Sequence, residues 1–471
     1  MKINLKHIVV LGLLVLGTSC DSFLDVHPKG EVLGKDLLTD RKGFENAMYG
    51  VYATMREPSL YGKNMTYYVM DVMGQYFTCQ GNDGITDLSS FNYYKNADVK
   101  QVFFDIWSNM YRNISYLNNV LINLEGESSN SLKFYDIYKG EALGLRAFLH
   151  FDLLRLFASQ QNGPDVEGIV YCTDFSLTPA DVAKKEVIVK RIVSELRESE
   201  RLLDNPELYE QAAANDAYLR DRSTHFNLQA ARATLARVYL TIGNTDSAYY
   251  YADKVIQESG LSLVDKTEIG EDIIGTLSAD ETIFGLYSKD IYPYTKEDLY
   301  DQISFKSLNP RNDMQKLYDA TNVGNDFRWS AWFEVRSNAL RFIKLTDKYQ
   351  LMAGTRPEGM IPGINLIRLP EMYYIAAECL LDKDLPRATE YFNKVLQSRG
   401  LNALEDRVPE EPLTLQKIVD ERYKEFIGEG QSFFNMKRLN LDIKRVTNEV
   451  VTAREDIYVI RIPEEEFNYR Y

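Results

Sequence analysis

Two segments of this 471-residue chain place aromatic rings beside amide and carboxylate side chains. Sugars present C–H faces that pack on aromatic rings, and hydroxyl groups that need hydrogen-bonding partners. Such a segment can therefore form a shallow binding surface for a carbohydrate. The side chains that could do this chemistry are Tyr76, Phe77, Asn82 and Asp83 in the first segment and Trp329 and Trp332 in the second, with Tyr292 and Tyr294 as additional aromatics.

Each of these aromatic residues has an alternative role in the interior. Tryptophan is mostly buried on average, so packing and ligand contact both stay open for Trp329 and Trp332. The same two roles stay open for Tyr76 and Phe77. Arg328 follows an aspartate by two residues, and a structural ion-paired turn is the interpretation that we favour for it.

Catalytic and metal-binding patterns are absent from the sequence. After the first 25 residues there are three histidines and three cysteines, with no CxxC or CxxH spacing and no nucleophile motif. Oxygen donors gather at Asn82–Asp87 but lack the spacing of a twelve-residue calcium loop. Glu421 and Glu425 stand one helical turn apart with Lys424 between them, which indicates a solvated charged face. A Ser–His–Asp or Cys–His site is therefore possible only with very few candidates, and we expect no metal site and no cofactor.

Composition and charge limit the class of protein. The chain is 45% hydrophobic and 26% charged, which is typical of a folded protein. Its net charge is −15, and this argues against nucleic acid as a partner because phosphate binding needs concentrated Lys and Arg.

One internal repeat recurs at an offset of 140 residues. Residues 235–261 match residues 375–401, with the same Ala, Leu, Tyr, Lys and Gly at equivalent positions. Small residues twelve apart, followed by an aromatic residue and Val, are typical of the two closely packed helices of a tetratricopeptide unit. Such units, which include 227–261 and 365–401, are not stable alone and must stack on neighbouring helices.

Other segments show helical or strand periodicity. Helices are expected at Phe44–Met55, Phe103–Leu124, Glu141–Phe157, Val187–Leu203, Leu415–Ile427 and Ser432–Leu439. Short β-type runs occur at Thr282–Tyr287, Arg341–Leu345 and Ile457–Ile462. Long irregular insertions at about 74–100 and 260–362 contain the aromatic segments, and loops this long are usually functional. The expected fold is mostly α: a tetratricopeptide-like scaffold of helical pairs, with long irregular insertions and a few short β-strands.

The first 25 residues have the pattern of an export signal. Lys2 and Lys6 precede the apolar run Ile8–Leu16, small residues follow, and then Cys20. The run is too short for a permanent membrane helix, and a cysteine directly after the cleavage site is typical of a bacterial lipoprotein. Lipidation of Cys20 would tether an otherwise soluble protein to a membrane. An ordinary signal peptide with a chance cysteine is the alternative.

Several motifs together resemble one family, the SusD/RagB-like nutrient-uptake lipoproteins of the Bacteroidetes outer membrane. The start CDSFLDVHPKGEV is similar to the family's lipidated N-terminus, and EALGLRAFLHFDLLRLFA to one of its helices. INLIRLPEMYYIAAECL, IVDERYKEFIGEGQSFFNMKR and RIPEEEF resemble its C-terminal signatures. Gly17, where a strict lipobox has Leu, and Asn435, where the family usually has Asp, depart from the pattern.

The resemblance implies a non-catalytic binding role. Such proteins capture an oligosaccharide, or in some relatives a peptide, at the cell surface and deliver it to a SusC-like TonB-dependent outer-membrane barrel. On this basis we expect a signal peptide at 1–19, a lipidated tether at 20–34 and one helical domain at 35–471, with ligand contacts in the insertions.

Two other classes of protein stay as alternatives. A surface glycan hydrolase would need two carboxylates across a cleft, and no such pair stands out in the sequence. A tetratricopeptide scaffold that binds only proteins would have short loops, whereas this chain contains long insertions.

Overall fold

The computed structural model describes residues 38–79, 81, 83–175, 180–206, 216–272, 275–301, 307–321, 323–352, 354–356 and 360–467. The signal segment 1–19, the tether 20–34 with Cys20, and Asn82 lie outside these residues. Lipidation of Cys20 and ligand contact by Asn82 therefore stay predictions.

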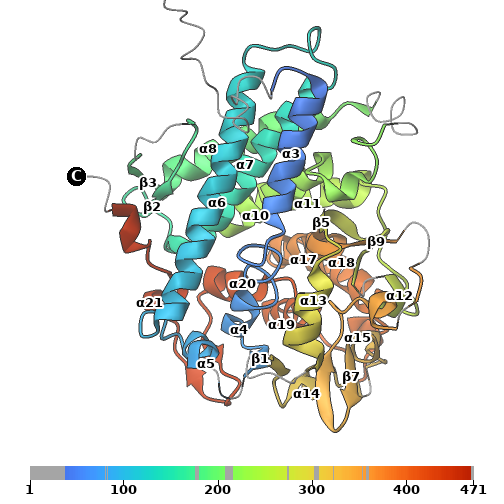
Figure 1. The fold of residues 1–471 in the computed structure, drawn as a ribbon. Helices are drawn as coiled ribbons and strands as arrows, with labels where there is room; N and C mark the ends of the chain where they lie inside the picture. Colours follow the sequence, from blue (N-terminus) through green and yellow to red (C-terminus); the bar gives the residue numbers. More distant parts are fainter. Residues whose placement is uncertain are drawn as a thin grey trace, which may run out of the picture.

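Long helices form the first part of the scaffold (Figure 1). They are α3 (Arg41–Met55), α6 (Ala97–Leu124), α7 (Tyr135–Phe157) and α8 (Lys185–Leu203). Helix α7 packs against both α6 and α8, and most of its side chains are buried, as its nearly continuous apolar sequence predicts. The sequence placed these helices correctly but began α6 and α7 several residues too late. The side chain of Asn96 caps the true start of α6 by accepting a hydrogen bond from Asp98 N at 2.9 Å.

The internal repeat forms two helical pairs, as predicted. The pairs are α10 (Leu228–Thr241) with α11 (Thr245–Glu258), and α17 (Leu369–Leu380) with α18 (Leu385–Ser398). Asn244 and Asp384 cap the second helix of each pair by accepting a backbone N–H three residues on. Helix α11 packs against α17, and α10 packs against α8, so the repeats continue the stack of the first helices.

The C-terminal part adds α19 (Leu415–Glu425) and α20 (Ser432–Leu439), both predicted. The run Ile457–Ile462 was predicted as a strand, and this is wrong. Its first residues belong to the helical turn α21 (Glu455–Tyr458), and the residues after it pair with no strand of the described chain. Ile457 and Ile460 are buried, so their apolar character reflects packing of a turn and an irregular segment and not strand alternation.

A three-stranded antiparallel sheet connects the long insertion to the repeats. Its order is β4 (Thr276–Leu277), β9 (Ile361–Arg368), β5 (Thr282–Tyr287), and β9 continues directly into α17. The predicted strand at Thr282–Tyr287 is confirmed. The run Arg341–Leu345 overlaps β8 (Ala339–Phe342), which forms a hairpin with β7 (Phe333–Arg336).

The remaining described elements are short. The helical ones are α4 (Val69–Met73), α5 (Asp83–Ser89), η2 (Arg222–Thr224), α12 (Ile269–Asp272), α13 (Ile291–Thr295), η3 (Lys296–Asp301), α14 (Met314–Leu317), α15 (Phe327–Trp332), α16 (Lys348–Leu351), η4 (Leu404–Asp406) and η5 (Glu464–Phe467). The strands are β1 (Phe77–Thr78) with β6 (Asn309–Pro310), β2 (Glu167–Val170) with β3 (Val182–Lys184), and β10 (Ile443–Lys444) with β11 (Val450–Val451). None of the described helices is both long and apolar enough to cross a membrane.

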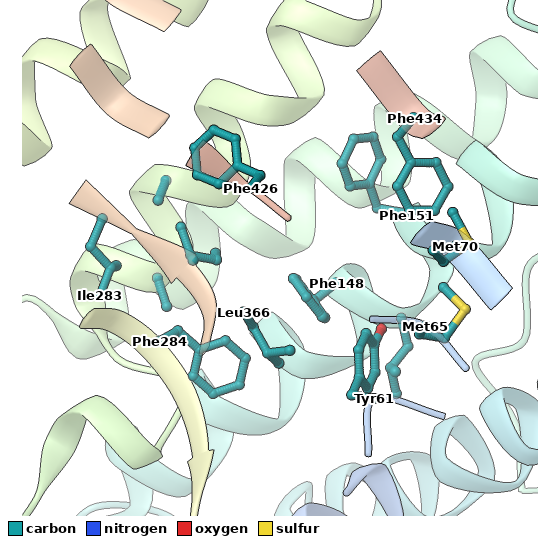
Figure 2. Packing of buried hydrophobic residues seen from close by; sticks show 14 of the residues in the cluster. Tyr61, Met65, Met70, Phe148, Phe151, Ile283, Phe284, Leu366, Phe426 and Phe434 are labelled. Carbon is teal, nitrogen blue, oxygen red and sulfur yellow. The ribbon is translucent and has the colours of Figure 1, made fainter. Parts of the chain in front are cut away.

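One cluster of buried apolar side chains extends from Leu38 to Ile460. Figure 2 shows part of it, where Phe148 of α7 lies between side chains of the N-terminal segment and of strands β5 and β9. The insertion and the helical scaffold therefore share one core.

A network of charged side chains is also buried within the structure. Arg368 donates hydrogen bonds to Glu281 and Glu425 at 2.9 and 2.8 Å, and Arg399 binds the same two carboxylates. Arg328 donates to Asp326 at 2.7 and 2.8 Å, which confirms the predicted ion-paired turn. We call this set the buried ion network; its members are Glu281, Asp326, Arg328, Lys344, Arg368, Arg399, Glu421, Lys424, Glu425 and Glu429.

The network overturns the interpretation of Glu421 and Glu425 as a solvated face. Both are buried, because the insertion and the repeats bring arginines onto that side of α19. Burial alone would raise the pKa of Glu425, but Arg399 and Arg368 hold it well below its ordinary value.

Candidate ligand-binding groove

Three of the six aromatic residues predicted for the site are part of the interior. Trp332, Tyr76 and Phe77 are fully buried. Tyr76 stacks on Tyr423 of α19, with ring centroids 4.1 Å apart, and its hydroxyl hydrogen-bonds Ser432 Oγ at 2.5 Å. Phe77 lies in β1, with its ring 5.6 Å from that of Phe342. In this structure these rings offer no surface to a ligand.

The two predicted tryptophans share the short helix α15 but differ in exposure. Trp329 is half-buried and stacks on Phe333 at 4.9 Å, so one part of its ring stays accessible. The ring of Trp332 lies under the ammonium of Lys344, at 4.1 Å, and is enclosed. Ligand contact by Trp329 therefore remains an untested prediction, whereas Trp332 is occupied by packing.

The other predicted residues lie nearer the surface. Tyr294 of α13 is 41% exposed and Tyr292 is half-buried. Asp83 is exposed at the first turn of α5. The described candidates from the two insertions are thus divided between core and surface, and they do not form one platform.

A groove of about 830 Å³ provides a different aromatic surface. It lies between α3, the segment 217–225, the end of β5 and the start of β9. Tyr49 of α3 and Tyr287 of β5 line it and are 43% and 41% exposed. We call it the tyrosine groove; its lining is Tyr49, Tyr52, Ala53, Arg56, Ala217, Arg220, Asp221, Thr224, His225, Tyr287, Lys289, Arg356, Met360, Ile361 and Pro362.

Backbone geometry sets the position of both exposed rings. Tyr49 follows Met48 on α3, one step off the buried stripe, so it points away from the core while Tyr52 points inward. Tyr287 is the last residue of β5, where the burial of the strand ends. Arg56 connects the two walls by donating to the carbonyl of Tyr287 at 3.1 Å.

The carboxylate of Glu141 holds one wall of the groove in place. It accepts hydrogen bonds from the hydroxyls of Tyr52 and Tyr218 at 2.9 and 2.8 Å, and it pairs with Arg222 at 2.5 Å. Burial would raise the pKa of Glu141, but Arg222 and His225 lower it to about 2. The carboxylate is therefore ionised at neutral pH and fixes Tyr52 and His225, which line the groove.

Cationic donors predominate among the charged residues of the lining. Arg56, Arg220, Lys289 and Arg356 are basic, and Asp221 is the acidic residue among those that line it. Exposed aromatic rings beside many hydrogen-bond donors suit a ligand with apolar faces and many hydroxyl oxygens. The volume is within the range of small-molecule and oligosaccharide sites.

None of the described residues that the sequence predicts as ligand contacts lines this groove. One signal was present, since Tyr49 is an aromatic residue outside the apolar stripe of its predicted helix. The meeting of α3 with residues 217–225 and 287–289 depends on contacts between segments about 170 to 240 residues apart, which a single sequence does not show.

Comparisons with known proteins agree with the fold. Residues 22–240 match the SusD-like family described as "Starch-binding associating with outer membrane", and residues 304–471 match the SusD family. No curated protein matches the chain.

Solved structures of this family are similar over nearly their whole length. A SusD superfamily protein from Bacteroides thetaiotaomicron has a TM-score of 0.73 at 23% identity, with 90% of this chain and 97% of that chain covered. A SusD-like carbohydrate binding protein from Bacteroides vulgatus has a TM-score of 0.69 at 19% identity, with coverage of 91% and 96%. A laminarin binding SusD-like protein has a TM-score of 0.66 at 17% identity, with coverage of 91% and 98%. At these identities the structures support the same fold.

Proposed function

The chain belongs to the SusD/RagB family of non-catalytic, glycan-binding proteins associated with outer-membrane uptake, and we propose that it captures an oligosaccharide in the tyrosine groove. The observation that carries this proposal is the pair of exposed rings, Tyr49 of α3 and Tyr287 of β5, in the lining of a groove rich in hydrogen-bond donors. Sugar rings pack on such aromatic faces, and their hydroxyls accept from arginine and lysine.

The N-terminal sequence supports the proposal that the protein binds its ligand at the cell surface. In the proposal, cleavage after residue 19 leaves a lipidated Cys20 and a tether to residue 34, and one domain from residue 35 carries the groove. The family association with the outer membrane supports this location. A SusC-like TonB-dependent barrel is the proposed acceptor of the ligand.

The test uses the soluble chain from Asp21 to Tyr471, which contains every described residue. A glycan and peptide array identifies the ligand, and calorimetry then measures its affinity for single variants. Removal of one aromatic contact of about 0.5–1.5 kcal/mol weakens binding roughly twofold to tenfold. We expect this loss in both Tyr49→Ala and Tyr287→Ala.

Tyr116→Ala is the matched control. Tyr116 lies on α6, is 43% exposed like Tyr49, and does not line the groove. Unchanged affinity in both groove variants would reject the groove. If only Trp329→Ala weakens binding, the ligand site lies in the insertion predicted from the sequence. If the array shows binding to peptides alone, the ligand is a peptide and not a glycan.

A further inference from the structure

A second, smaller cavity lies where the helical repeats meet the C-terminal helices. It measures about 50 Å³, and its walls come from α7, α8, α10, α17, α19 and α20. Figure 1 labels these helices. We call it the cationic cavity; its basic residues are Arg155, Lys185, Arg237, Arg422, Lys437 and Arg438. Of the described residues, none lines both this cavity and the tyrosine groove.

Three arginines in the cavity have N–H groups without an acceptor in the described part of the chain. These groups are Nε of Arg155, Nη1 of Arg237, and both Nε and Nη1 of Arg422. Arg237 and Arg422 are 4% and 6% exposed, and the side chain of Arg155 is 8% exposed. Buried donors in native proteins nearly always have a partner, so several together indicate an acceptor that the described residues do not supply.

The other atoms of these arginines are held in place, so the unpaired donors have fixed directions. Arg237 Nε donates to Glu371 at 2.8 Å, and Arg422 Nη2 lies 3.6 Å from the same carboxylate. Arg155 pairs with Asp152 and donates to Gln431 at 3.1 Å. Its guanidinium also lies 3.9 Å from the ring of Phe434, which is beside Phe151 in Figure 2.

Charge in the cavity is not balanced. Among the described residues, four of the six basic groups pair with three carboxylates, those of Asp152, Glu371 and Glu378, while Lys185 and Lys437 donate to backbone carbonyls. Among the described residues, Lys437 donates to a single backbone carbonyl, that of Leu156. The charge of Glu455 on α21 raises the pKa of Lys437, but Glu455 is exposed. Burial lowers the pKa of both Lys437 and Arg422, and neighbouring Lys185 lowers that of Lys437 further. Water alone would satisfy donors here but would leave the excess positive charge.

We propose that the cationic cavity binds one small tetrahedral oxyanion, phosphate or sulfate. Guanidinium groups present parallel N–H donors that match the oxygens of such an anion, and charge-assisted hydrogen bonds of this kind are the strongest. The cavity is several times larger than the roughly 10–15 Å³ needed for one water. Half-buried Ser159, Gln160 and Gln431 also line the cavity.

The bound anion would connect elements that are far apart in the sequence. Arg155 belongs to α7, Arg237 to the first repeat and Arg422 to the C-terminal helix α19. An anion that accepts from all three stabilises the folded chain, because the unfolded chain does not assemble these donors.

The test measures phosphate binding to the chain from Asp21 to Tyr471. Equilibrium dialysis with radiolabelled inorganic phosphate is expected to give one ion per chain. The melting temperature is expected to rise with phosphate and then level off, and to rise less in sodium chloride of the same ionic strength. No bound phosphate or sulfate at 10 mM overturns the proposal.

Two variants locate the site. Arg422→Gln removes two of the unpaired donors and is expected to weaken phosphate binding at least tenfold. Gln160→Glu places a carboxylate in the wall of the cavity, so it is expected to abolish phosphate binding while the protein stays folded. Arg112→Gln removes the same charge at the surface, where Arg112 pairs with Glu57, and should bind phosphate as the unmodified chain does. Unchanged binding in Gln160→Glu shows that the ion is held elsewhere and overturns the proposal, even if Arg422→Gln fails to fold.

Discussion

The buried ion network and the cationic cavity contain the same residue type at the same depth, but with different partners. Arg328, Arg368 and Arg399 are fully buried, and each faces at least two carboxylates. Arg237 and Arg422 are buried nearly as deeply and share one carboxylate, that of Glu371.

A single helix contributes to both regions. Helix α19 presents Glu421 and Glu425 to the network and Arg422, between them in sequence, to the cavity. Burial of an arginine therefore does not define its role; the supply of acceptors around it does. Within the described part of the chain, the carboxylates and cations of the network partner one another, whereas the cavity needs an acceptor that these residues do not supply.

The largest expected effect comes from removing the central cation of the network. Arg368→Met leaves the carboxylates of Glu281, Glu425 and Glu429 buried with fewer partners. We expect the free energy of unfolding, measured by urea denaturation, to fall by about 3–5 kcal/mol. Lys190→Met breaks an exposed pair with Glu186 and should change it by less than about 1 kcal/mol. Equal changes in the free energy of unfolding for the two substitutions would show that the network pairs stabilise the fold no more than surface pairs do.

The next largest effect concerns pH. The pKa of Glu425 is lower in the folded chain than in the unfolded chain. Its contribution to the free energy of unfolding is therefore fully present above the unfolded pKa of about 4.3, and it is lost as pH falls through the folded pKa. Glu425→Gln should cost roughly 3 kcal/mol at pH 7 and make the loss of stability in acid less steep. Urea denaturation at several pH values checks both. A variant whose acid profile matches that of the unmodified chain would contradict the assignment.

The smallest expected effect is an increase in the free energy of unfolding, and it concerns a residue of the cationic cavity. Lys437→Met removes a buried ammonium that has no carboxylate partner among the described residues, so without phosphate it should raise the free energy of unfolding by about 1 kcal/mol at pH 7. The pKa of Lys437 is lower in the folded chain than in the unfolded chain. The charged side chain therefore lowers the free energy of unfolding fully below the folded pKa, and this destabilisation disappears as pH rises to the unfolded pKa of about 10.4. The gain from the substitution should therefore shrink at high pH. A loss of stability at pH 7 would show that the ammonium is as well compensated as the network arginines.

The fold could be predicted from the sequence where the signal was local. Segments such as Phe44–Met55 and Ser432–Leu439 carry their own helical period, and the repeat at 235–261 and 375–401 identified its pairs directly. The resemblance to the SusD/RagB family, carried by motifs along the whole chain, gave the fold class and the binding role.

The candidate site could not be predicted in the same way. Whether Tyr76 is a ligand platform or a core residue is decided by Tyr423, 347 residues later in the chain. Glu425 looked solvated because its arginine partners come from residues 328, 368 and 399, which no local pattern connects to α19. In both cases the residue types of the segment are clear from the sequence, but the residues that pack against it are set by the tertiary fold.

Strand β5 connects the buried ion network to the tyrosine groove, and this affects how mutant phenotypes are interpreted. Glu281, the residue before its first, is bound by Arg368 and Arg399 in the interior, and its last residue, Tyr287, lines the tyrosine groove. A substitution of either arginine is therefore expected to displace a groove residue without touching it. In a screen for growth on a glycan, such a strain would be indistinguishable from one that lacks Tyr287. A melting curve of each purified protein would separate the two classes of mutant.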